Sequence, residues 1–323
     1  MSRWILIGGA GFTGLKIAED LIDRKVPNSK IIIADLKDSL TKVTLNVKKV
    51  SCDISKNILP EFKKNDIIIH LAARQYHLKI PYSDKLSWFR SVNVIGTKNV
   101  INNCLENKVK GLVFFSTDMV YGIPNFIPVT ANHPKNPIGP YGKSKLEAEK
   151  LCFLARKKGL PITILRPRLI MGKGRLGVMK KLFTSIFNGM PVPLIGNGKN
   201  CYQMVSVKDC SEAAILSVEK NFPNYELNLG SKIGPNVKTL INSLIKKVNS
   251  RSLVIPLPAY PVKICLSILE KLGWPILHKE QYKIADKNYI VDISDTYSKI
   301  GWKPTLSDKD MIIAAYNYWK NIK

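Results

Sequence analysis

Two side chains able to move a proton stand four residues apart in the segment YGKSK, which covers residues 141–145. If a helix begins here, Tyr141 and Lys145 lie on the same face of it. An ammonium group beside a phenol stabilises the phenolate, so the phenol can accept a proton from an alcohol closer to neutral pH. A tyrosine and a lysine at this spacing also occur as ordinary surface neighbours. The interpretation therefore depends on the segments around them.

A glycine-rich segment near the N-terminus supplies that context. Gly8, Gly11 and Gly14 form the pattern GxxGxxG in GGAGFTG, after an apolar run and at the start of a predicted helix. Glycines at such a turn let backbone N–H groups approach a pyrophosphate, and the helix N-terminus favours negative charge. Asp35 ends the next apolar run, at about the 20-residue spacing where a carboxylate receives the adenosine ribose hydroxyls. This carboxylate would repel a 2′-phosphate, which favours NAD over NADP as cofactor.

Short apolar runs alternate with longer amphipathic segments through the first half of the chain, a rhythm typical of βαβ units. Strands are predicted at 3–8, 30–34, 48–52, 66–71, 110–116 and 162–166, and helices at 13–24, 94–107 and 141–158. The fold class is therefore α/β, a doubly wound parallel sheet of the Rossmann type. Ligands of such sheets bind at the carboxyl ends of the strands, where Ser116, Thr117 and Asp118 stand.

The rhythm changes after Pro167. Helices are predicted at 176–189, 208–220, 236–248 and 308–320, strands at 192–195, 203–207 and 225–230, and a turn at 196–200. We expect an NAD-binding domain of residues 1–167, to which a returning segment at about 201–231 contributes. Residues 168–200 and 232–323 would form a smaller C-terminal α/β domain that binds substrate.

The composition disfavours several classes of protein. The formal net charge is +26, but the lysines are spread over the whole chain and only nine of the 50 basic residues are arginine. Binding to nucleic acid is therefore not indicated. The six cysteines contain no CxxC pair, so neither a metal site nor a disulfide framework is expected. No run reaches the roughly 20 apolar residues of a membrane span, and residues 1–10 do not read as a signal peptide. We expect a cytoplasmic protein, and peripheral membrane contact stays open.

Taken together, the motifs resemble the extended short-chain dehydrogenase/reductase family, in particular its NAD-dependent epimerase/dehydratase branch. The resemblance covers nearly the whole chain and includes GGAGFTG, HLAA at 70–73, NVIGTKNV at 93–100, STDMVYG at 116–122 and YGKSK. It implies that Tyr141 is the general base, that Lys145 holds the nicotinamide ribose and tunes Tyr141, and that Thr117 hydrogen-bonds the substrate oxygen. Asp53 would meet the adenine, and Asn93 would lie behind the cofactor. The other cofactor contacts implied are Phe12, Thr13, Ile54, Leu71, Ala72, Ala73 and Ser116.

One departure from the family pattern concerns dehydration. The 4,6-dehydratases continue the Ser-Thr-Asp motif with a glutamate, whereas Met119 stands at that position here. A thioether cannot carry the proton needed to expel water. Dehydratase chemistry is therefore disfavoured, although Asp118 remains a candidate catalytic acid.

A second departure concerns the substrate. Sugar-nucleotide members usually carry two arginines that face the substrate pyrophosphate, but Tyr202 stands at about the first position and no arginine follows Arg251. Tyr202 is therefore a candidate substrate contact. The basic candidates that remain are Arg168, Lys173, Arg175 and Lys199.

The segment 255–277 is apolar and punctuated by prolines. Its apolar residues fall largely at helical spacing and are Ile255, Leu257, Val262, Cys265, Leu266, Leu269, Leu272 and Trp274. This pattern resembles the 3β-hydroxysteroid dehydrogenase-like branch of the family, whose substrates are apolar. Two interpretations stay open, because these residues could line a substrate pocket or form the core of the second domain.

The motif set favours an NAD-dependent sugar-nucleotide 4-epimerase, which oxidises a carbinol through Tyr141 and reduces the ketone from its other face. The alternative is an NAD-dependent dehydrogenase or reductase of an apolar alcohol. A 4,6-dehydratase and a non-catalytic NAD-binding regulator are disfavoured. By family resemblance we also expect a homodimer that pairs through the helices at 94–107 and 141–158.

Overall fold

A sheet of seven parallel strands forms the centre of this computed structural model, which describes residues 2–174, 179–232 and 234–323. The strand order is β10-β6-β5-β4-β1-β2-β3. Most of these strands are buried along their whole length, as expected of a parallel sheet covered on both faces. The Rossmann-type fold class is confirmed. The bounds are β1 Trp4–Ile7, β2 Ile31–Asp35, β3 Lys48–Ser51, β4 Ile67–His70, β5 Gly111–Phe115, β6 Ile162–Pro167 and β10 Glu226–Leu229.

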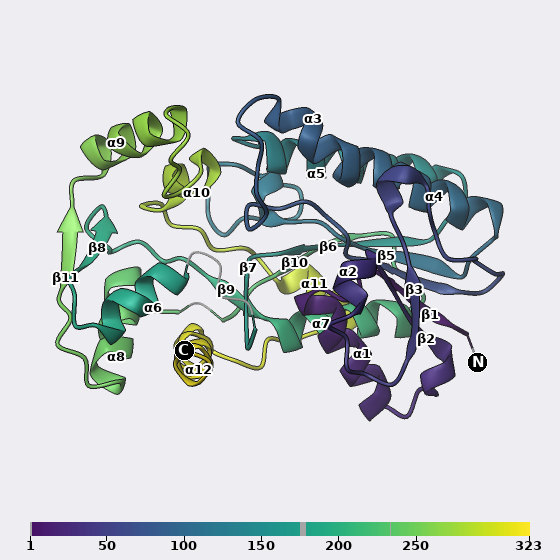
Figure 1. Cartoon of the computed structure of the whole chain (residues 1–323). Helices are drawn as coiled ribbons and strands as arrows, with labels where there is room; N and C mark the ends of the chain where they lie inside the picture. The colour runs from purple at the N-terminus through teal and green to yellow at the C-terminus, as the bar shows by residue number, and fades with distance from the viewer. Residues whose placement is uncertain (1, 175–178, 233) are drawn as a thin grey trace.

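Helices cover the two faces of the sheet, and each face has its own apolar core (Figure 1). On one face lie α1 (Phe12–Asp23), α7 (Val207–Glu219) and α11 (Ser294–Ile300). The other face is covered by α4 (Thr97–Glu106) and α5 (Pro140–Lys157), with α3 (Lys85–Arg90) packed beside α5. The short helix α2 (Lys37–Leu40) and single 3₁₀ turns at Asn28–Lys30, Ile54–Lys56 and Asp118–Val120 complete this part.

The predicted helix at 94–107 has a more complex form. A π-helical segment, Ser91–Gly96, joins α3 to α4. It buries Asn93 and Gly96, and a side chain at Gly96 would collide with Ile54 at 2.5 Å. Segments of π-helix often occur at functional sites, and this one brings the 3₁₀ turn at Ile54–Lys56 close to the helix.

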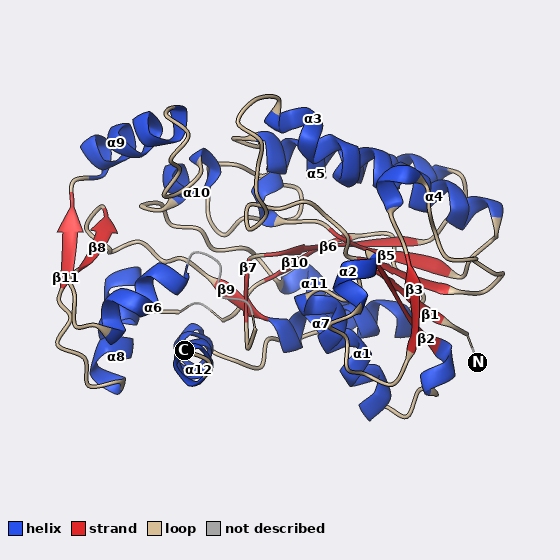
Figure 2. Ribbon diagram, in the orientation of Figure 1, coloured by secondary structure: helices blue, strands red, loops and turns tan. Residues whose placement is uncertain are grey.

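Most of the chain that follows β6, apart from α7, β10 and α11, builds the smaller part of the molecule, which Figure 2 shows beyond the end of the main sheet. Two small parallel sheets pair β7 (Leu169–Met171) with β9 (Met204–Ser206) and β8 (Val192–Ile195) with β11 (Val254–Leu257). A third apolar core lies among α6 (Met179–Phe187), α8 (Val237–Lys247) and α12 (Asp308–Asn321). This separate core supports our proposed division into a cofactor domain and a substrate domain.

The apolar segment 255–277 neither lines a pocket along its length nor forms a core, so both interpretations of it are corrected. It contains most of β11 and the helix α9 (Ala259–Lys271), and it is followed by α10 (Lys279–Ile284). Pro258 and Pro261 fall at the N-cap and in the first turn of α9, where proline costs no helical hydrogen bond. Leu266 is the single buried residue of α9. Trp274, at the end of the segment, leaves 73% of its surface exposed.

The described part of the chain contains no helix that is both long and apolar enough to cross a lipid bilayer.

Candidate active site

A cavity of about 1040 Å³ lies where the loops that follow the central strands meet the smaller part of the molecule. This volume is at the upper end of the range of small-molecule sites, roughly 300–1000 Å³. Nearly all of the site residues predicted from the sequence line this cavity. The predicted residues in its lining are Gly8, Gly11, Phe12, Thr13, Gly14, Asp35, Asp53, Ile54, Leu71, Ala72, Ala73, Ser116, Thr117, Asp118, Tyr141, Lys145, Arg168 and Tyr202.

The glycine-rich loop leaves space for a ligand because its backbone packs closely. Gly8 has a φ of +78°, and a Cβ at this position would lie 2.5 Å from the backbone nitrogen of Ala72. Gly14 packs against Gly9, where a Cβ would again lie 2.5 Å from backbone. Gly11 is the N-cap of α1 and supplies no side-chain cap. Backbone N–H groups at the start of α1 can therefore receive an anion.

Two carboxylates stand at the ends of β2 and β3. Asp35 is partly buried and accepts hydrogen bonds from the backbone N–H groups of Ala10 (3.0 Å) and Leu36 (2.8 Å). Burial raises the pKa of Asp35, and these hydrogen bonds oppose that rise. Asp53 accepts from the hydroxyl of Ser55 at 2.6 Å, which lowers the pKa of Asp53. Both groups are thus held in the cavity wall as acceptors for hydroxyl or amine donors.

Asn93 lies behind the wall of the cavity, as expected, and is not among the residues that line it. It is fully buried behind the loop that follows β4. Its side-chain oxygen accepts from the Arg74 N–H at 2.8 Å, and its nitrogen donates to the Arg74 carbonyl at 3.1 Å and to Ser144 Oγ at 2.9 Å. Asn93 therefore ties this loop to α5 and acts on the site through its backbone.

The proposed proton-transfer group comes from the end of β5 and the first turns of α5. Thr117, Tyr141 and Lys145 are all buried and all line the cavity. The Lys145 Nζ donates to the carbonyl of Phe115 at 2.7 Å and lies 4.0 Å from the centre of the Phe114 ring. Burial lowers the pKa of Lys145 to about 8. Lys145 therefore carries a positive charge at neutral pH that a ribose hydroxyl or a phenolate could share.

Arg168 is a buried cation in the wall of the cavity with part of its hydrogen-bonding capacity unused. Its Nη1 donates to Asp118, and the guanidinium lies over the rings of Tyr289 (3.9 Å) and Tyr202 (4.4 Å). Its Nε and Nη2 are buried and have no hydrogen-bond partner among the described residues. Leaving buried donors unpaired is costly, so this edge of the guanidinium is suited to an anionic or carbonyl group of a ligand.

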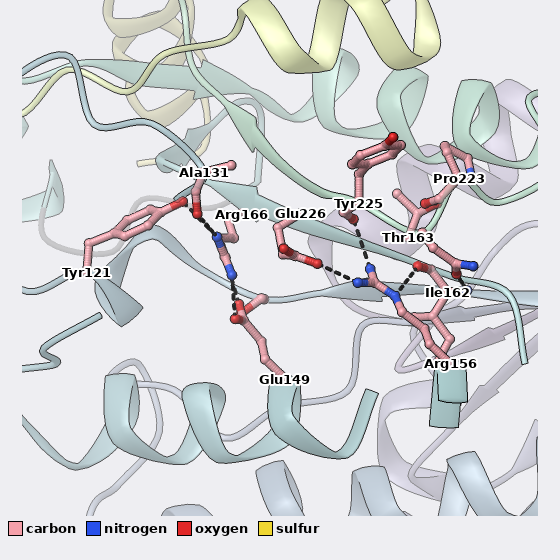
Figure 3. Close-up of polar contacts among 12 residues, drawn as sticks. Tyr121, Ala131, Glu149, Arg156, Ile162, Thr163, Arg166, Pro223, Tyr225 and Glu226 are labelled. Atoms are coloured by element: carbon pink, nitrogen blue, oxygen red, sulfur yellow. Dashed lines mark hydrogen bonds and ion pairs between the residues drawn. The ribbon is translucent and has the colours of Figure 1, made fainter. Parts of the chain in front are cut away.

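A second arginine, two residues earlier, is fully engaged within the protein (Figure 3). Arg166 contacts both carboxylate oxygens of Glu149, through Nε at 2.9 Å and Nη2 at 2.7 Å. Its Nη1 donates to the Tyr121 hydroxyl and to the Ala131 carbonyl, both at 2.9 Å. Ser116 Oγ donates to the same carboxylate of Glu149 at 2.6 Å. This network positions Ser116 from behind the cavity.

The other basic candidates that the structure describes lie outside the lining of the cavity. Lys199 lies in the exposed turn at 196–200 and is absent from the lining of the cavity, so its assignment to the substrate site is corrected. Gly196 and Gly198 in the same turn have positive φ values of 84° and 72°. Lys173 also lies outside the lining, Arg175 falls outside the described residues, and Lys181 of α6 is a lysine that the sequence analysis missed.

The model of the NAD dependent epimerase/dehydratase family matches residues 4–230 of the chain. The chain belongs to this family. It is therefore an NAD-dependent enzyme of the epimerase/dehydratase type. The cavity fits that cofactor, because the glycine-rich loop is free of side chains where the pyrophosphate would lie and Asp35 stands in the wall nearby.

Relatives of known name agree with this assignment. The chain is 29% identical over 329 residues to a "Putative UDP-glucose 4-epimerase" of Methanocaldococcus jannaschii, with 98% of each chain covered. It is 28% identical over 277 residues to the N-acetyl-alpha-D-glucosaminyl-diphospho-ditrans,octacis-undecaprenol 4-epimerase of Escherichia coli, covering 83% of this chain and 80% of that one. The crystal structure of a UDP-glucose 4-epimerase from Thermotoga maritima with UDP-glucose superposes with a TM-score of 0.77, at 23% identity and 99% coverage of both chains.

The structure of this epimerase/dehydratase family member adds residues that the sequence analysis missed. The loop after HLAA contributes Arg74, Gln75, Tyr76, His77 and Leu78 to the cavity. The segment before α10 contributes Pro275, Ile276, Leu277 and His278, and the first turn of α10 contributes Gln281. The polar and aromatic run directly after a strand end was a usable signal for the first set. The second set carries no motif, because only the tertiary fold brings residues 275–281 to the strand ends.

Two of these segments meet at the start of α5. The ring of Tyr76 stacks on His278 with a centroid distance of 4.3 Å and meets Tyr141 edge-on at 5.8 Å. Glu280, from α10, accepts from the N–H of Gly142 at 3.1 Å. The N-cap of α5 is Gly139, which has no side chain, and a Cβ there would collide with Glu280 at 2.5 Å. The smaller part of the molecule therefore caps the helix that carries Tyr141.

Proposed function

We propose that this protein is an NAD-dependent 4-epimerase of a nucleotide sugar. The observation that carries the proposal is the convergence of Thr117, Tyr141 and Lys145 with the glycine-rich loop around one cavity. These groups are the ones needed to take a proton from a secondary alcohol beside a dinucleotide. The relatives named above support a sugar bound through a diphosphate as substrate.

The protein's own residues handle the proton. Tyr141 is held as a phenolate by the positive charge of Lys145, and this phenolate accepts the proton of the sugar hydroxyl to become a neutral phenol. Thr117 orients the same hydroxyl. NAD, when bound, takes up hydride from the carbinol carbon and gives it back. If the ketone turns its other face to the cofactor before hydride and proton return, the alcohol re-forms with the opposite configuration at that carbon.

The cofactor would be held along the ends of β1 to β4. The N–H groups at the start of α1 face the pyrophosphate, Asp35 receives the adenosine ribose hydroxyls, and Asp53 accepts from the adenine amine. A carboxylate at position 35 repels a 2′-phosphate, so NAD should bind more tightly than NADP. Equal affinities in calorimetry would contradict this assignment of Asp35.

Two other chemistries fit the cavity less well. Dehydration needs a free acid beside the sugar, but Met119 cannot transfer a proton, and the carboxylate of Asp118 is already engaged by Arg168. An apolar alcohol would need an apolar pocket, yet of the segment 255–277 the lining includes only residues 275–277. A non-catalytic binding module would not need Thr117, Tyr141 and Lys145 together.

Epimerisation can be tested directly. Purified protein with NAD is incubated with UDP-glucose, UDP-galactose and their N-acetylated and uronic acid forms, and the products are separated by chromatography. We expect one epimer pair to interconvert without net reduction of NAD. Turnover of an apolar secondary alcohol with accumulation of NADH, and no epimer formed, would favour the dehydrogenase alternative.

We also propose a cytoplasmic homodimer that pairs through α4 and α5. Ile95, in the π-helical segment, and Leu154, in α5, leave 52% and 56% of their surfaces exposed. A monomer by light scattering at micromolar concentration would contradict the proposed pairing.

A further inference from the structure

The helix α9 turns an apolar stripe to solvent. Tyr260, Ile264 and Ile268 recur at every fourth residue, so they lie along one face of the helix, and Leu272 continues the line at its end. Their exposed fractions are 79%, 43%, 51% and 61%. Figure 1 places α9 at the outer edge of the smaller part of the molecule, far from the main sheet.

Neighbouring side chains extend this stripe into a surface. Trp274 follows the helix, and Tyr82 reaches it from the loop after β4, where its hydroxyl donates to the carbonyl of Lys271. We call Tyr82, Tyr260, Ile264, Ile268, Leu272 and Trp274 the α9 surface. Contiguous exposed apolar patches of this kind mark sites of interaction with proteins or membranes.

Positive charges predominate in the segments that carry the α9 surface. Lys79, Lys271 and Lys279 are exposed in the loop after β4, at the end of α9 and at the start of α10. Of the carboxylates there, Glu270 contacts Lys85 and His278, Asp286 contacts Lys263, and Asp84 caps α3 by accepting from the Ser87 N–H. An apolar helical face flanked by free lysines complements a bilayer that contains anionic lipid, because the apolar side chains enter the interface while the lysines meet the headgroups.

The α9 surface also borders the reaction site. A cleft of about 180 Å³ lies between the end of α9 and the loop that carries Tyr82. Leu78, Pro275 and His278 line this cleft and also line the large cavity. Whatever covers the α9 surface therefore lies next to the entrance of the cavity from this side.

We propose that the α9 surface docks the enzyme on the surface of a membrane that contains anionic lipids. Docking uses insertion of the apolar stripe and attraction of the flanking lysines, with no segment crossing the bilayer. The inference goes beyond the proposed epimerase activity and does not depend on which sugar is converted. Its test is therefore separate from the activity assay.

Sedimentation with lipid vesicles tests the proposal. The full chain is mixed with vesicles of phosphatidylcholine alone or with added phosphatidylglycerol, and the bound fraction is measured at low and high salt. We expect binding to the mixed vesicles that weakens as salt rises. The double change Ile264→Asp/Ile268→Asp should lower the partition coefficient by at least about tenfold. The control Ile322→Asp places one aspartate at an exposed isoleucine near the C-terminus, and the single variant Ile268→Asp matches its charge on the α9 surface. Binding should fall in Ile268→Asp and stay unchanged in Ile322→Asp.

Tryptophan fluorescence gives a second readout that does not depend on a disruptive variant. Trp274 is exposed, whereas Trp4, Trp302 and Trp319 are buried and Trp88 is half-buried. Vesicles should shift the emission of the wild type to shorter wavelength. Trp274→Phe should remove this shift while the protein still sediments with the vesicles.

Two results would overturn the proposal. One is equal vesicle binding by the double variant and the Ile322→Asp control. The other is a change of oligomeric state in the double variant, seen by light scattering, with no vesicle binding by the wild type. In that case the α9 surface would be an interface between copies of the protein.

Discussion

Arg166 and Arg168 stand two residues apart at the end of one strand, and their surroundings differ in one respect. Both guanidinium groups are buried and both contact a carboxylate, Glu149 for Arg166 and Asp118 for Arg168. Arg166 makes four hydrogen bonds, all to the protein itself. Arg168 keeps Nε and Nη2 without partners in the described structure, at the wall of the cavity.

This difference separates a structural group from a ligand-binding group. A buried cation with each nitrogen bonded to the protein has a structural role, as Arg166 does, and removing it leaves its carboxylate partner buried and unpaired. A buried cation with free donors costs stability until a ligand arrives, and residues of this kind concentrate at functional sites. Mutations in the Arg166 network should therefore change the stability of the fold, whereas mutations of Arg168 should change the affinity for a ligand.

The largest effect is expected on the cavity side, at Tyr141. Tyr141→Phe removes the phenolic oxygen, which as phenolate accepts the substrate proton, and should lower turnover by about 10²–10⁴-fold. The fold and the affinity for NAD should be retained, as measured by thermal melting and calorimetry. Near-normal turnover would mean that another base serves this site.

The next largest effect concerns the fold. Arg166→Leu leaves Glu149 buried without its partner and should cost about 3–5 kcal/mol of the free energy of unfolding, measured with urea. The double change Arg166→Leu/Glu149→Leu should recover part of this loss, since no buried charge then remains. A single variant as stable as the wild type would remove the structural role that we assign to Arg166.

Glu280 belongs neither to the Arg166 network nor to the surroundings of Arg168. It lies in α10 and caps α5, the helix that carries Tyr141. Burial raises the pKa of Glu280 to about 7, against the effect of the Gly142 and Tyr76 hydrogen bonds. A carboxyl whose pKa is higher in the folded state stabilises the fold most below its unfolded pKa of about 4.3, and this contribution is lost as pH rises through 7. Relative to Glu280→Gln, the wild type should therefore lose stability on the order of 3 kcal/mol between pH 4.5 and 8. Parallel curves of stability against pH for the two proteins would contradict the assignment.

The smallest expected effect, a change in nucleotide affinity, tests most directly whether Arg168 and Arg166 have different roles. Arg168→Lys keeps a cation beside Asp118 but removes the free Nε–Nη2 edge, so affinity for uridine diphosphate with saturating NAD should fall by about 1.5–3 kcal/mol. The melting temperature should change little. The matched variant Arg166→Lys should do the reverse, lowering the melting temperature without weakening the nucleotide. Unchanged affinity in Arg168→Lys would place the diphosphate elsewhere.

Much of the first half of the molecule could be predicted from the sequence. The glycine-rich loop, Asp35, the strand ends and YGKSK all depend on contacts within one βαβ unit or on the general rule that parallel strands end at the same edge. Local spacing therefore placed nearly every predicted cofactor residue in the cavity. Asn93 lies behind the site as expected, but its hydrogen bonds to the Arg74 backbone and its place in a π-helical segment were not predicted.

The second half could not be predicted in the same way. The helical pattern of 255–277 showed apolar residues at regular spacing, but a pattern on one helix does not say whether another element packs on it. The structure leaves the stripe of α9 exposed and brings only the end of this segment to the cavity. The assignment of Lys199 to the substrate site was wrong for a related reason, because the position of a turn residue depends on the elements on both sides of it.

The sequence by itself determined the fold class, the cofactor loop and the Tyr141–Lys145 pair, because these depend on local backbone geometry and on spacing along a single helix or strand. Only the tertiary structure decided which of two adjacent arginines has free donors and that Glu280 caps the catalytic helix. Each of those outcomes depends on partners more than a dozen residues away along the chain, and the packing of separate elements supplies them.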